Sequence, residues 1–301
     1  MASPSEKKVA LVTGVTGFTG KYVKAQLEAS GYRVHGWSHG GSALPNTARV
    51  DMVDRDAVWG ATEALRPEVV VHLAAISFVA HGDVDAIYRL NVVGTRNLLS
   101  ALAGQVQRPR RVILASSANV YGNTAGVIAE DAMPSPQNDY AVSKLAMEYM
   151  AKLWQAELPI TVIRPFNYTG VGQSLKFLLP KIVHHFQRRA EVMELGNLDI
   201  SRDFNDVRNV ADAIVRLAES SDTGGVYNIC SGKEYSLKGI IDTMSEISGH
   251  HLDVRVNPDF VRSNEVKSLR GDNGRLVRAI GELPAFDLRK TLSWMFEHQG
   301  Q

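Results

Sequence analysis

Short apolar segments alternate with amphipathic helical segments along the first half of this 301-residue chain. We expect strands at Val9–Thr13, Tyr32–Trp37, Glu68–Leu73, Arg111–Ala115 and Ile160–Ile163, and helices at 18–30, Asp54–Leu65, Val84–Leu102 and Asp139–Ala156. Strands that alternate with helices pair in parallel, and helices cover both faces of such a sheet. The pattern predicts an α/β fold with a doubly wound parallel sheet, which binds ligands at the carboxyl ends of its strands.

The alternation changes after Arg164-Pro165, where segments become shorter and richer in charge. Here we expect helices near 175–189, 207–219, 236–248 and 287–297, and a strand at Val226–Ile229. We therefore interpret residues 1–164 as a Rossmann-type domain and residues 165–301 as a smaller C-terminal α/β lobe that binds substrate. Some segments of this lobe should return to the first sheet.

Composition excludes several classes of function. A formal net charge of +1 gives no reason to expect nucleic acid or membrane as a partner. Cys230 is the only cysteine, which excludes an intrachain disulfide and most thiolate metal sites. No run of about 18 apolar residues is present, and the polar start at 1–8 lacks the apolar core of a secretory signal. We expect a cytoplasmic protein without a metal ion.

A glycine-rich turn, Gly14-x2-Gly17-x2-Gly20, follows the first expected strand and opens the first expected helix. Glycines in such a turn let backbone amides approach a pyrophosphate, which the positive end of the helix also favours. The turn, together with Phe18, therefore predicts a dinucleotide site. Its spacing differs from the standard Gly-x-Gly-x2-Gly pattern, so a glycine-rich connection without a ligand is the alternative.

The end of the second expected strand has no acidic residue between Ser38 and Ser42. An acid there would hold the ribose 2′-hydroxyl of NAD, and its absence removes repulsion against the 2′-phosphate of NADP. Ser38 and His39 can hydrogen-bond to that phosphate, so NADP(H) is the expected cofactor, with NAD(H) as the alternative. Asp51 and Met52 could flank the adenine, although Asp51 could equally be an ordinary loop acid.

Tyr140 and Lys144 are four residues apart in an expected helix and therefore share one face. The ammonium group should lower the phenol pKa from its usual value of about 10. Such a tyrosine can donate and accept a proton near neutral pH. With Ser117 at the end of an earlier strand, the pair predicts transfer of a hydride and a proton at one carbon–oxygen bond. The alternative is an ordinary amphipathic tyrosine and a serine that caps a strand end.

The motifs occur in one order along nearly the whole chain: Gly14-x2-Gly17-x2-Gly20, His72-Leu-Ala-Ala75, Asn91-x2-Gly94-Thr95, Ser116-Ser117-x3-Tyr121-Gly122, Tyr140-x3-Lys144 and Arg164-Pro165-x-Asn167. Together they resemble the extended short-chain dehydrogenase/reductase family. The resemblance implies that Tyr140 is the general acid, that Lys144 lowers its pKa and binds the nicotinamide ribose, and that Ser117 hydrogen-bonds the reacting oxygen. It also implies that Leu73, Ala74, Ala75, Asn91 and Phe166 line the cofactor channel.

The resemblance also narrows the substrate. Dehydratases of the family carry a carboxylate where this chain has Asn119, which argues against a 4,6-dehydratase. The segments Leu195–Asp199, Arg202–Phe204, Arg262–Val266 and Leu269–Asp272 resemble the GDP-mannose branch. By this likeness Lys181, Arg202 and Arg262 bind the diphosphate, Glu265 binds a ribose hydroxyl of GDP, and Ser77, Asn119 and Asn167 contact the sugar. The alternatives are an ion pair of Arg202 with Asp203 or Asp206, and a solvated Arg262.

The segments 164–173 and 226–232 resemble the enzymes of this branch that reduce GDP-6-deoxy-4-keto-D-mannose with NADPH. The implied product is GDP-D-rhamnose or its C4 epimer GDP-6-deoxy-D-talose. Two other hypotheses remain open: a nucleotide-sugar 4-epimerase with tightly bound NAD, and a non-catalytic module that binds NADP. The family also commonly forms homodimers through the helices expected near 84–102 and 139–156.

Overall fold

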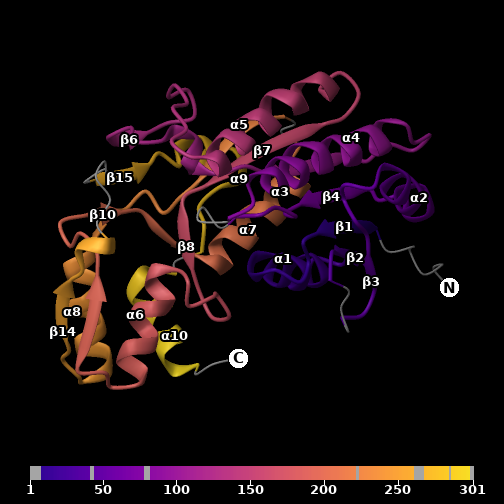
Figure 1. Cartoon of the computed structure of the whole chain (residues 1–301). Helices are drawn as coiled ribbons and strands as arrows, with labels where there is room; N and C mark the ends of the chain where they lie inside the picture. Colours follow the sequence, from indigo (N-terminus) through magenta and orange to yellow (C-terminus); the bar gives the residue numbers. More distant parts are fainter. Residues whose placement is uncertain are drawn as a thin grey trace.

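The central element of the protein, seen in a computed structural model, is a seven-stranded parallel sheet (Figure 1). Its strands are β1 (Val9–Thr13), β2 (Arg33–Ser38), β3 (Thr47–Arg49), β4 (Val69–His72), β5 (Arg111–Ala115), β7 (Ile160–Pro165) and β12 (Gly225–Ile229). They are ordered β12-β7-β5-β4-β1-β2-β3, and every neighbouring pair is parallel. The structure describes residues 8–40, 44–77, 82–221, 224–260, 268–284 and 286–298. The expected doubly wound fold is confirmed.

Each face of this sheet buries its own apolar cluster under helices. The covering helices are α1 (Phe18–Ala29), α2 (Arg55–Leu65), α4 (Thr95–Ala103), α5 (Asp139–Ala151) and α7 (Val207–Glu219). In β1, Ala10 and Val12 pack in the cluster formed with α1 and α7, whereas Leu11 packs in the cluster formed with α2, α4 and α5. This division follows from the period of two along a strand.

The helix expected at Val84–Leu102 is interrupted. The chain forms α3 (Val84–Tyr88), then a π-helical turn at Arg89–Gly94, and then α4. A π turn adds one residue to a helical turn and often lies at a functional site. The helix expected to reach Ala156 also ends earlier, because α5 stops at Ala151 and a 3-10 turn follows at Lys152–Trp154.

The second half of the chain builds a smaller lobe. Its elements, with one early strand, are β6 (Gly126–Ile128), β8 (Asn167–Thr169), α6 (Leu178–Gln187), β9 (Val192–Leu195), β10 (Ser201–Arg202), β11 (Phe204–Asp206), β13 (Tyr235–Ser236), α8 (Leu237–Ser248), β14 (Asp253–Val256), a 3-10 turn (Pro258–Phe260), β15 (Ser268–Gly271) and α10 (Leu288–Glu297). A third apolar cluster joins α6, α8 and α10, which lie together away from the large sheet (Figure 1). A four-stranded sheet has the order β13-β10-β15-β6.

Three segments of the second half return to the first sheet: β12, α7 and α9 (Gly274–Ile280), whose Leu276 packs in the apolar cluster that α7 also enters. Strand β12 pairs with β7 at its edge, and Val226 lies opposite Val162. Helix α7 packs against α1 and the sheet through Val210 and Ile214. The division at residue 164 therefore stays a prediction, whereas the expected return of later segments is observed. No helix in the described ranges is both long and apolar enough to cross a membrane.

Candidate active site

The glycine-rich turn lies between β1 and α1, where the backbone leaves no room for a side chain. Gly14 has a φ of +69°, and a Cβ atom on it would lie 2.9 Å from the backbone nitrogen of Ala74. A Cβ atom on Gly20 would collide with the carbonyl oxygen of Gly14. Gly17 precedes α1 without a side-chain hydrogen bond to the helix. The helix therefore presents its first amide groups uncapped by any side chain, which suits a pyrophosphate.

Phe18 joins this turn to the strand β8. Its ring stacks on that of Tyr168 with a centroid distance of 6.0 Å, and the Tyr168 hydroxyl hydrogen-bonds the Thr19 hydroxyl over 2.7 Å. Tyr168 is also near enough to Tyr140 to raise its pKa. The sequence analysis assigned no role to Tyr168. The one feature that could have indicated it is its place in the segment 164–173, three residues after Pro165.

The residues expected at the adenine end of the cofactor differ in their surroundings. Ser38, at the end of β2, is buried and its hydroxyl has no hydrogen-bond partner, whereas His39 is exposed. Asp51 is exposed and its Oδ1 accepts a hydrogen bond from the Val53 amide over 2.9 Å, as a loop acid does. The side chain of Met52 is buried in the core under α2 and α4. An unpartnered buried hydroxyl at Ser38 fits a ligand phosphate at this position.

The end of β4 is held by a buried histidine that sequence reasoning had quoted only as part of a motif. His72 Nδ1 is 2.7 Å from the Thr13 hydroxyl and Nε2 is 2.8 Å from the Thr95 hydroxyl. Burial, with a smaller effect of the Lys144 charge, lowers the pKa of His72 to about 3. The ring is therefore neutral at physiological pH. It ties the strand that precedes the glycine-rich turn to α4.

The loop after β4 carries several expected site residues. Leu73, Ala74 and Ala75 are half-buried and Ser77 is exposed. Asn91, in the π turn, accepts a hydrogen bond from the Ile76 amide over 3.0 Å. It also donates to the Ile76 carbonyl over 3.2 Å and to the Ser143 hydroxyl over 3.0 Å. Its side chain therefore fastens this loop to α5, and a direct contact with cofactor stays a prediction.

Ser117, Tyr140 and Lys144 come together at the ends of β5 and the start of α5. Helix α5 begins after Asn138, whose side chain accepts a hydrogen bond from the Ala141 amide over 2.9 Å, and this cap places Tyr140 in the first turn. Tyr140 is buried, and its phenol lies close enough to the Ser117 side chain for their interaction to lower its pKa. The Ser117 hydroxyl also accepts from the Asn119 amide over 3.1 Å. The hydroxyl and the phenol thus point at one place, as one reacting oxygen requires.

The electrostatics of the pair differ from the expectation. Burial raises the pKa of Tyr140 to about 12, against the lowering effect of its hydrogen bond with Ser117. Lys144 Nζ lies 6.0 Å from the centre of the Tyr140 ring and donates to the Ala115 carbonyl over 2.7 Å. Burial lowers the pKa of Lys144 to about 8, although Glu148 opposes this. The lowered phenol pKa expected from sequence is therefore wrong for this structure, because desolvation dominates; Tyr140 is protonated at neutral pH.

The expected substrate residues lie mainly at the second lobe. Asn167 Nδ2 donates to the Asp203 carbonyl over 3.3 Å, Arg202 Nη1 donates to the Ser201 carbonyl over 2.9 Å, and Lys181 Nζ donates to the Glu194 carbonyl over 3.1 Å. Phe166 is buried in a cluster with Tyr121 and Cys230. Arg262 and Glu265 lie outside the described residues. Their roles stay predictions.

Asp203 and Asp206 have other partners than Arg202, with which an ion pair was the alternative to diphosphate binding. The carboxylate of Asp203 accepts from the amides of Ser231, Gly232 and Gly271 at 2.8, 3.0 and 3.3 Å. Asp206 pairs with Arg208 over 2.7 Å. Both acids therefore serve to join strands and to cap α7. The buried Asp203 fixes the turn that follows Arg202.

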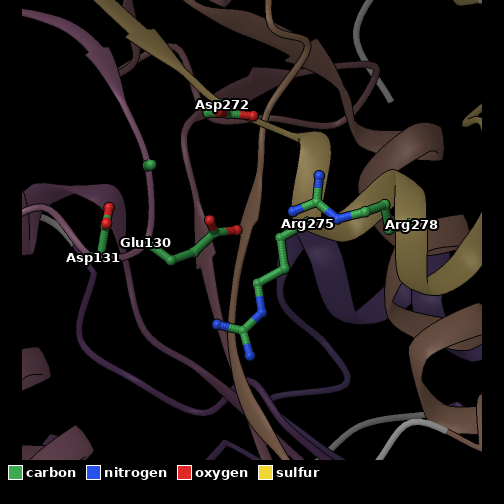
Figure 2. Close-up of a pocket in the computed structure, with 6 residues that line it drawn as sticks. Glu130, Asp131, Asp272, Arg275 and Arg278 are labelled. Atoms are coloured by element: carbon green, nitrogen blue, oxygen red, sulfur yellow. The ribbon is translucent and has the colours of Figure 1, made fainter.

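A pocket of about 280 Å³ lies elsewhere, beside α9 and the edge strand β12 (Figure 2). Its charged lining residues are Glu130, Asp131, Asp272, Arg275 and Arg278. None of them was expected in the site, and Figure 2 shows arginines and acids around the same hollow. We assign the chemistry to the convergence of Ser117 and Tyr140 rather than to this pocket. Among the described residues no cluster of three or more His, Cys, Asp or Glu could hold a metal ion.

The comparison with known proteins covers most of the chain. The NAD dependent epimerase/dehydratase family matches residues 10–230, and the chain belongs to this family. GDP-6-deoxy-D-talose 4-dehydrogenase of Aggregatibacter actinomycetemcomitans is 34% identical over 96% of this chain and 97% of that protein. GDP-6-deoxy-D-mannose reductase of Pseudomonas aeruginosa is 33% identical over 93% of both chains. The resemblance that was read from the motifs is confirmed.

Solved structures agree with this family. A protein of Burkholderia cenocepacia J2315, described as a candidate epimerase, is 51% identical over 96% of this chain and 97% of its own, with a TM-score of 0.92. RMD from Pseudomonas aeruginosa, solved as a complex with NADPH, is 32% identical over 96% of this chain and 98% of its own, with a TM-score of 0.85. The protein is thus a Rossmann-type member of a family of nucleotide-sugar enzymes.

Proposed function

We propose that this protein is an NAD(P)-dependent nucleotide-sugar oxidoreductase that reduces the C4 ketone of GDP-6-deoxy-4-keto-D-mannose. The observation that carries the proposal is the convergence of the Ser117 side chain, the buried Tyr140 phenol and Lys144, at the strand ends that also carry the glycine-rich turn. Two relatives of similar length are named for GDP-6-deoxy sugars. They support a GDP-sugar as the substrate class.

The glycine-rich turn at Gly14, Gly17 and Gly20 would hold the pyrophosphate of NADPH, and the cofactor when bound would supply a hydride for sugar C4. Tyr140 donates its phenolic proton to the ketone oxygen as the carbonyl bond becomes a single bond, which its pKa of about 12 permits at neutral pH. Ser117 donates a hydrogen bond to the same oxygen and stabilises its negative charge. Lys144 provides a positive charge near the resulting phenolate. The proton lost from Tyr140 is regained from solvent.

NADP(H) is the proposed cofactor and NAD(H) the second choice. The buried Ser38 hydroxyl has no partner, and the exposed His39 follows it, so both can serve a 2′-phosphate. A related structure holds NADPH. The absence of an acid at 38–42 favours the phosphorylated cofactor.

For the substrate we propose that Arg202 binds the diphosphate, since a guanidinium group matches phosphate oxygens with two parallel donors. Lys181, Arg262 and Glu265 are proposed on sequence likeness alone. The names of the two relatives support either GDP-D-rhamnose or GDP-6-deoxy-D-talose as the product. The face of the sugar presented to the hydride decides between them.

A homodimer is proposed through α5. Val142 and Tyr149 of α5 and Leu153 just after it are 39%, 59% and 74% exposed, and they follow one another at spacings of seven and four residues, on one face of a helix. Val93 in the π turn is also 43% exposed. Such a continuous apolar stripe fits a second copy of the same helix. The cytoplasm remains the proposed compartment.

The test is an assay of NADPH oxidation with GDP-6-deoxy-4-keto-D-mannose made in the cuvette from GDP-mannose by a separate 4,6-dehydratase. Oxidation with NADPH, and much less with NADH, supports the proposal, and NMR of the isolated product distinguishes rhamnose from talose. Absence of oxidation contradicts it. Retained NAD with interconversion of UDP-sugars would then identify an epimerase, and cofactor binding without any turnover a binding module.

A further inference from the structure

Glu148 and Arg164 form an ion pair inside the protein that the proposed mechanism does not use. Arg164 Nη2 lies 2.6 Å from Glu148 Oε2, and each side chain is 6% exposed. Arg164 Nε also donates to Glu148 Oε1 over 2.9 Å, and the Ser116 hydroxyl donates to the same oxygen. Both carboxylate oxygens are therefore occupied.

The pair is built against the catalytic lysine. Glu148 follows Lys144 by four residues on α5, as Lys144 follows Tyr140, so the three side chains share one helix face. Lys144 donates to the carbonyl of Ala115 over 2.7 Å, and the next residue, Ser116, donates to Glu148. Two consecutive residues at the end of β5 thus bind two consecutive turns of α5. Ser117 directly follows these two residues in the chain.

Arg164 is fixed on its other side as well. Its Nη1 donates to the Tyr121 hydroxyl over 2.9 Å and to the Glu130 carbonyl over 3.2 Å. Tyr121 in turn donates to Asn228 Oδ1 over 2.7 Å. A buried polar network in which each member has its partners holds a single arrangement. This one joins β5, α5, β7 and β12.

We propose that Glu148 is a positioning residue whose carboxylate, clamped by Arg164 and Ser116, sets the place and the positive charge of Lys144. This inference rests on the proposed function, because it gives Lys144 a catalytic part. A buried ammonium group needs a nearby negative charge to stay protonated. In the part of the chain that the structure describes, Glu148 is the carboxylate that raises the lysine pKa against the effect of burial.

The other groups near Lys144 do not supply that charge. His72 on β4 is neutral at physiological pH, and the phenols of Tyr140 and, on the turn after β5, Tyr121 have raised pKa values. Helices α3 and α4 pack against α5, and Tyr88 of α3 donates to Asp139, the exposed first residue of α5, over 3.0 Å. The charged residues of those helices and of the π turn are exposed: Asp85, Arg89 and Arg96.

The test is an NMR titration of the Lys144 side chain in the whole protein, with the ε-methylene signal assigned by its loss in Lys144→Arg. Glu148→Gln removes the negative charge and leaves Arg164 unpaired, so the Lys144 pKa should fall by about one unit or more. The alkaline limb of kcat against pH should move down by the same amount. The double variant Glu148→Gln with Arg164→Gln removes both charges, so the Lys144 pKa should return most of the way to its wild-type value.

A second variant keeps the ion pair and tests the opposite direction. Ser116→Ala removes one hydrogen-bond donor to Glu148, which leaves more negative charge facing Lys144, so the lysine pKa should rise. The control is Glu246→Gln, which breaks an exposed pair with Arg289 of the same 2.6 Å length and should leave Lys144 unchanged. An unchanged titration in both Glu148→Gln and Ser116→Ala overturns the inference.

The NMR titration needs no substrate, so it succeeds or fails independently of the proposed reaction. Loss of the proposed function would show as a wild-type protein without NADPH oxidation, while Lys144 still titrates as expected. The inference fails if the wild-type protein oxidises NADPH normally and the Lys144 pKa is the same in Glu148→Gln as in wild type.

Discussion

The proposed catalytic residues and the proposed substrate residues are held in different ways. Tyr140 and Lys144 are 7% and 5% exposed; Lys144 donates to the Ala115 carbonyl at the end of β5, and the Tyr140 phenol lies near the Ser117 side chain. Arg202 and Lys181 are half-buried; Arg202 donates to the Ser201 carbonyl and Lys181 to the Glu194 carbonyl. In the proposed function, the reacting groups are fixed before substrate arrives, whereas the groups that would receive the nucleotide stay accessible.

The difference has a physical reason. A proton donor must be placed within a fraction of an ångström of the reacting atom, and buried hydrogen bonds provide that precision. A phosphate-binding arginine gains most of its energy when the anion arrives, so it needs access more than rigidity. Substitutions in the two regions should therefore change different kinetic constants.

The largest effect is expected for Tyr140→Phe, which removes the proton donor and keeps the ring. kcat should fall by about 100-fold to 10,000-fold, while NADPH binding measured by fluorescence stays unchanged. Tyr32→Phe is the matched control. Tyr32 directly precedes β2, at the opposite end of the strands from the site, and its hydroxyl accepts a hydrogen bond from Arg110. A Tyr140→Phe enzyme with near-normal kcat would remove Tyr140 from the reaction.

A smaller effect is expected for Ser38→Asp, which places a negative charge where the 2′-phosphate is proposed to lie. Like charges in contact cost several kcal/mol, so the ratio of kcat/KM for NADPH to that for NADH should fall by about tenfold or more. Ser221→Asp adds the same charge at an exposed position and should leave the ratio unchanged. A constant ratio in Ser38→Asp would place the phosphate elsewhere.

In the second lobe, Arg202→Ala should raise KM for the GDP-sugar by about tenfold and leave kcat within a few-fold. The estimate follows from hydrogen bonds to charged groups, each worth about 1.5–3 kcal/mol. Arg255→Ala is the control, because that arginine is 64% exposed and pairs with Asp253. A loss of kcat with constant KM would assign Arg202 to the catalytic group and break the comparison between the regions.

The smallest effect is expected for Lys181→Ala. The Lys181 ammonium group already donates to the Glu194 carbonyl and lies 5.0 Å from the centre of the Phe260 ring. Lys181 would have to give up these contacts to bind the diphosphate, so its net contribution is small and KM for the GDP-sugar should rise by about threefold or less. A tenfold increase would show that Lys181 leaves these contacts for the diphosphate, as the sequence likeness predicts.

Much of the fold could be predicted because it depends on local patterns. The strand at Val9–Thr13 and the helix at 207–219 have the expected bounds, since their apolar periods are strong. The π turn at Arg89–Gly94 could not be predicted, because it depends on the bonds of Asn91 to Ile76 and Ser143, which are 15 and 52 residues away along the chain. Strand β10, with only two residues, is too short to show an alternation of apolar and polar residues, so it could not be predicted either.

The sequence by itself determined the doubly wound sheet, the glycine-rich turn and the shared helix face of Tyr140 and Lys144, because each follows from spacing along the chain. Only the tertiary structure decided how these groups titrate and what holds them. Burial raises the Tyr140 pKa where spacing alone predicted a fall, and the ion pair of Glu148 with Arg164 joins a helix to a strand. Desolvation and long-range hydrogen bonds depend on the packing of distant segments, which local spacing does not encode.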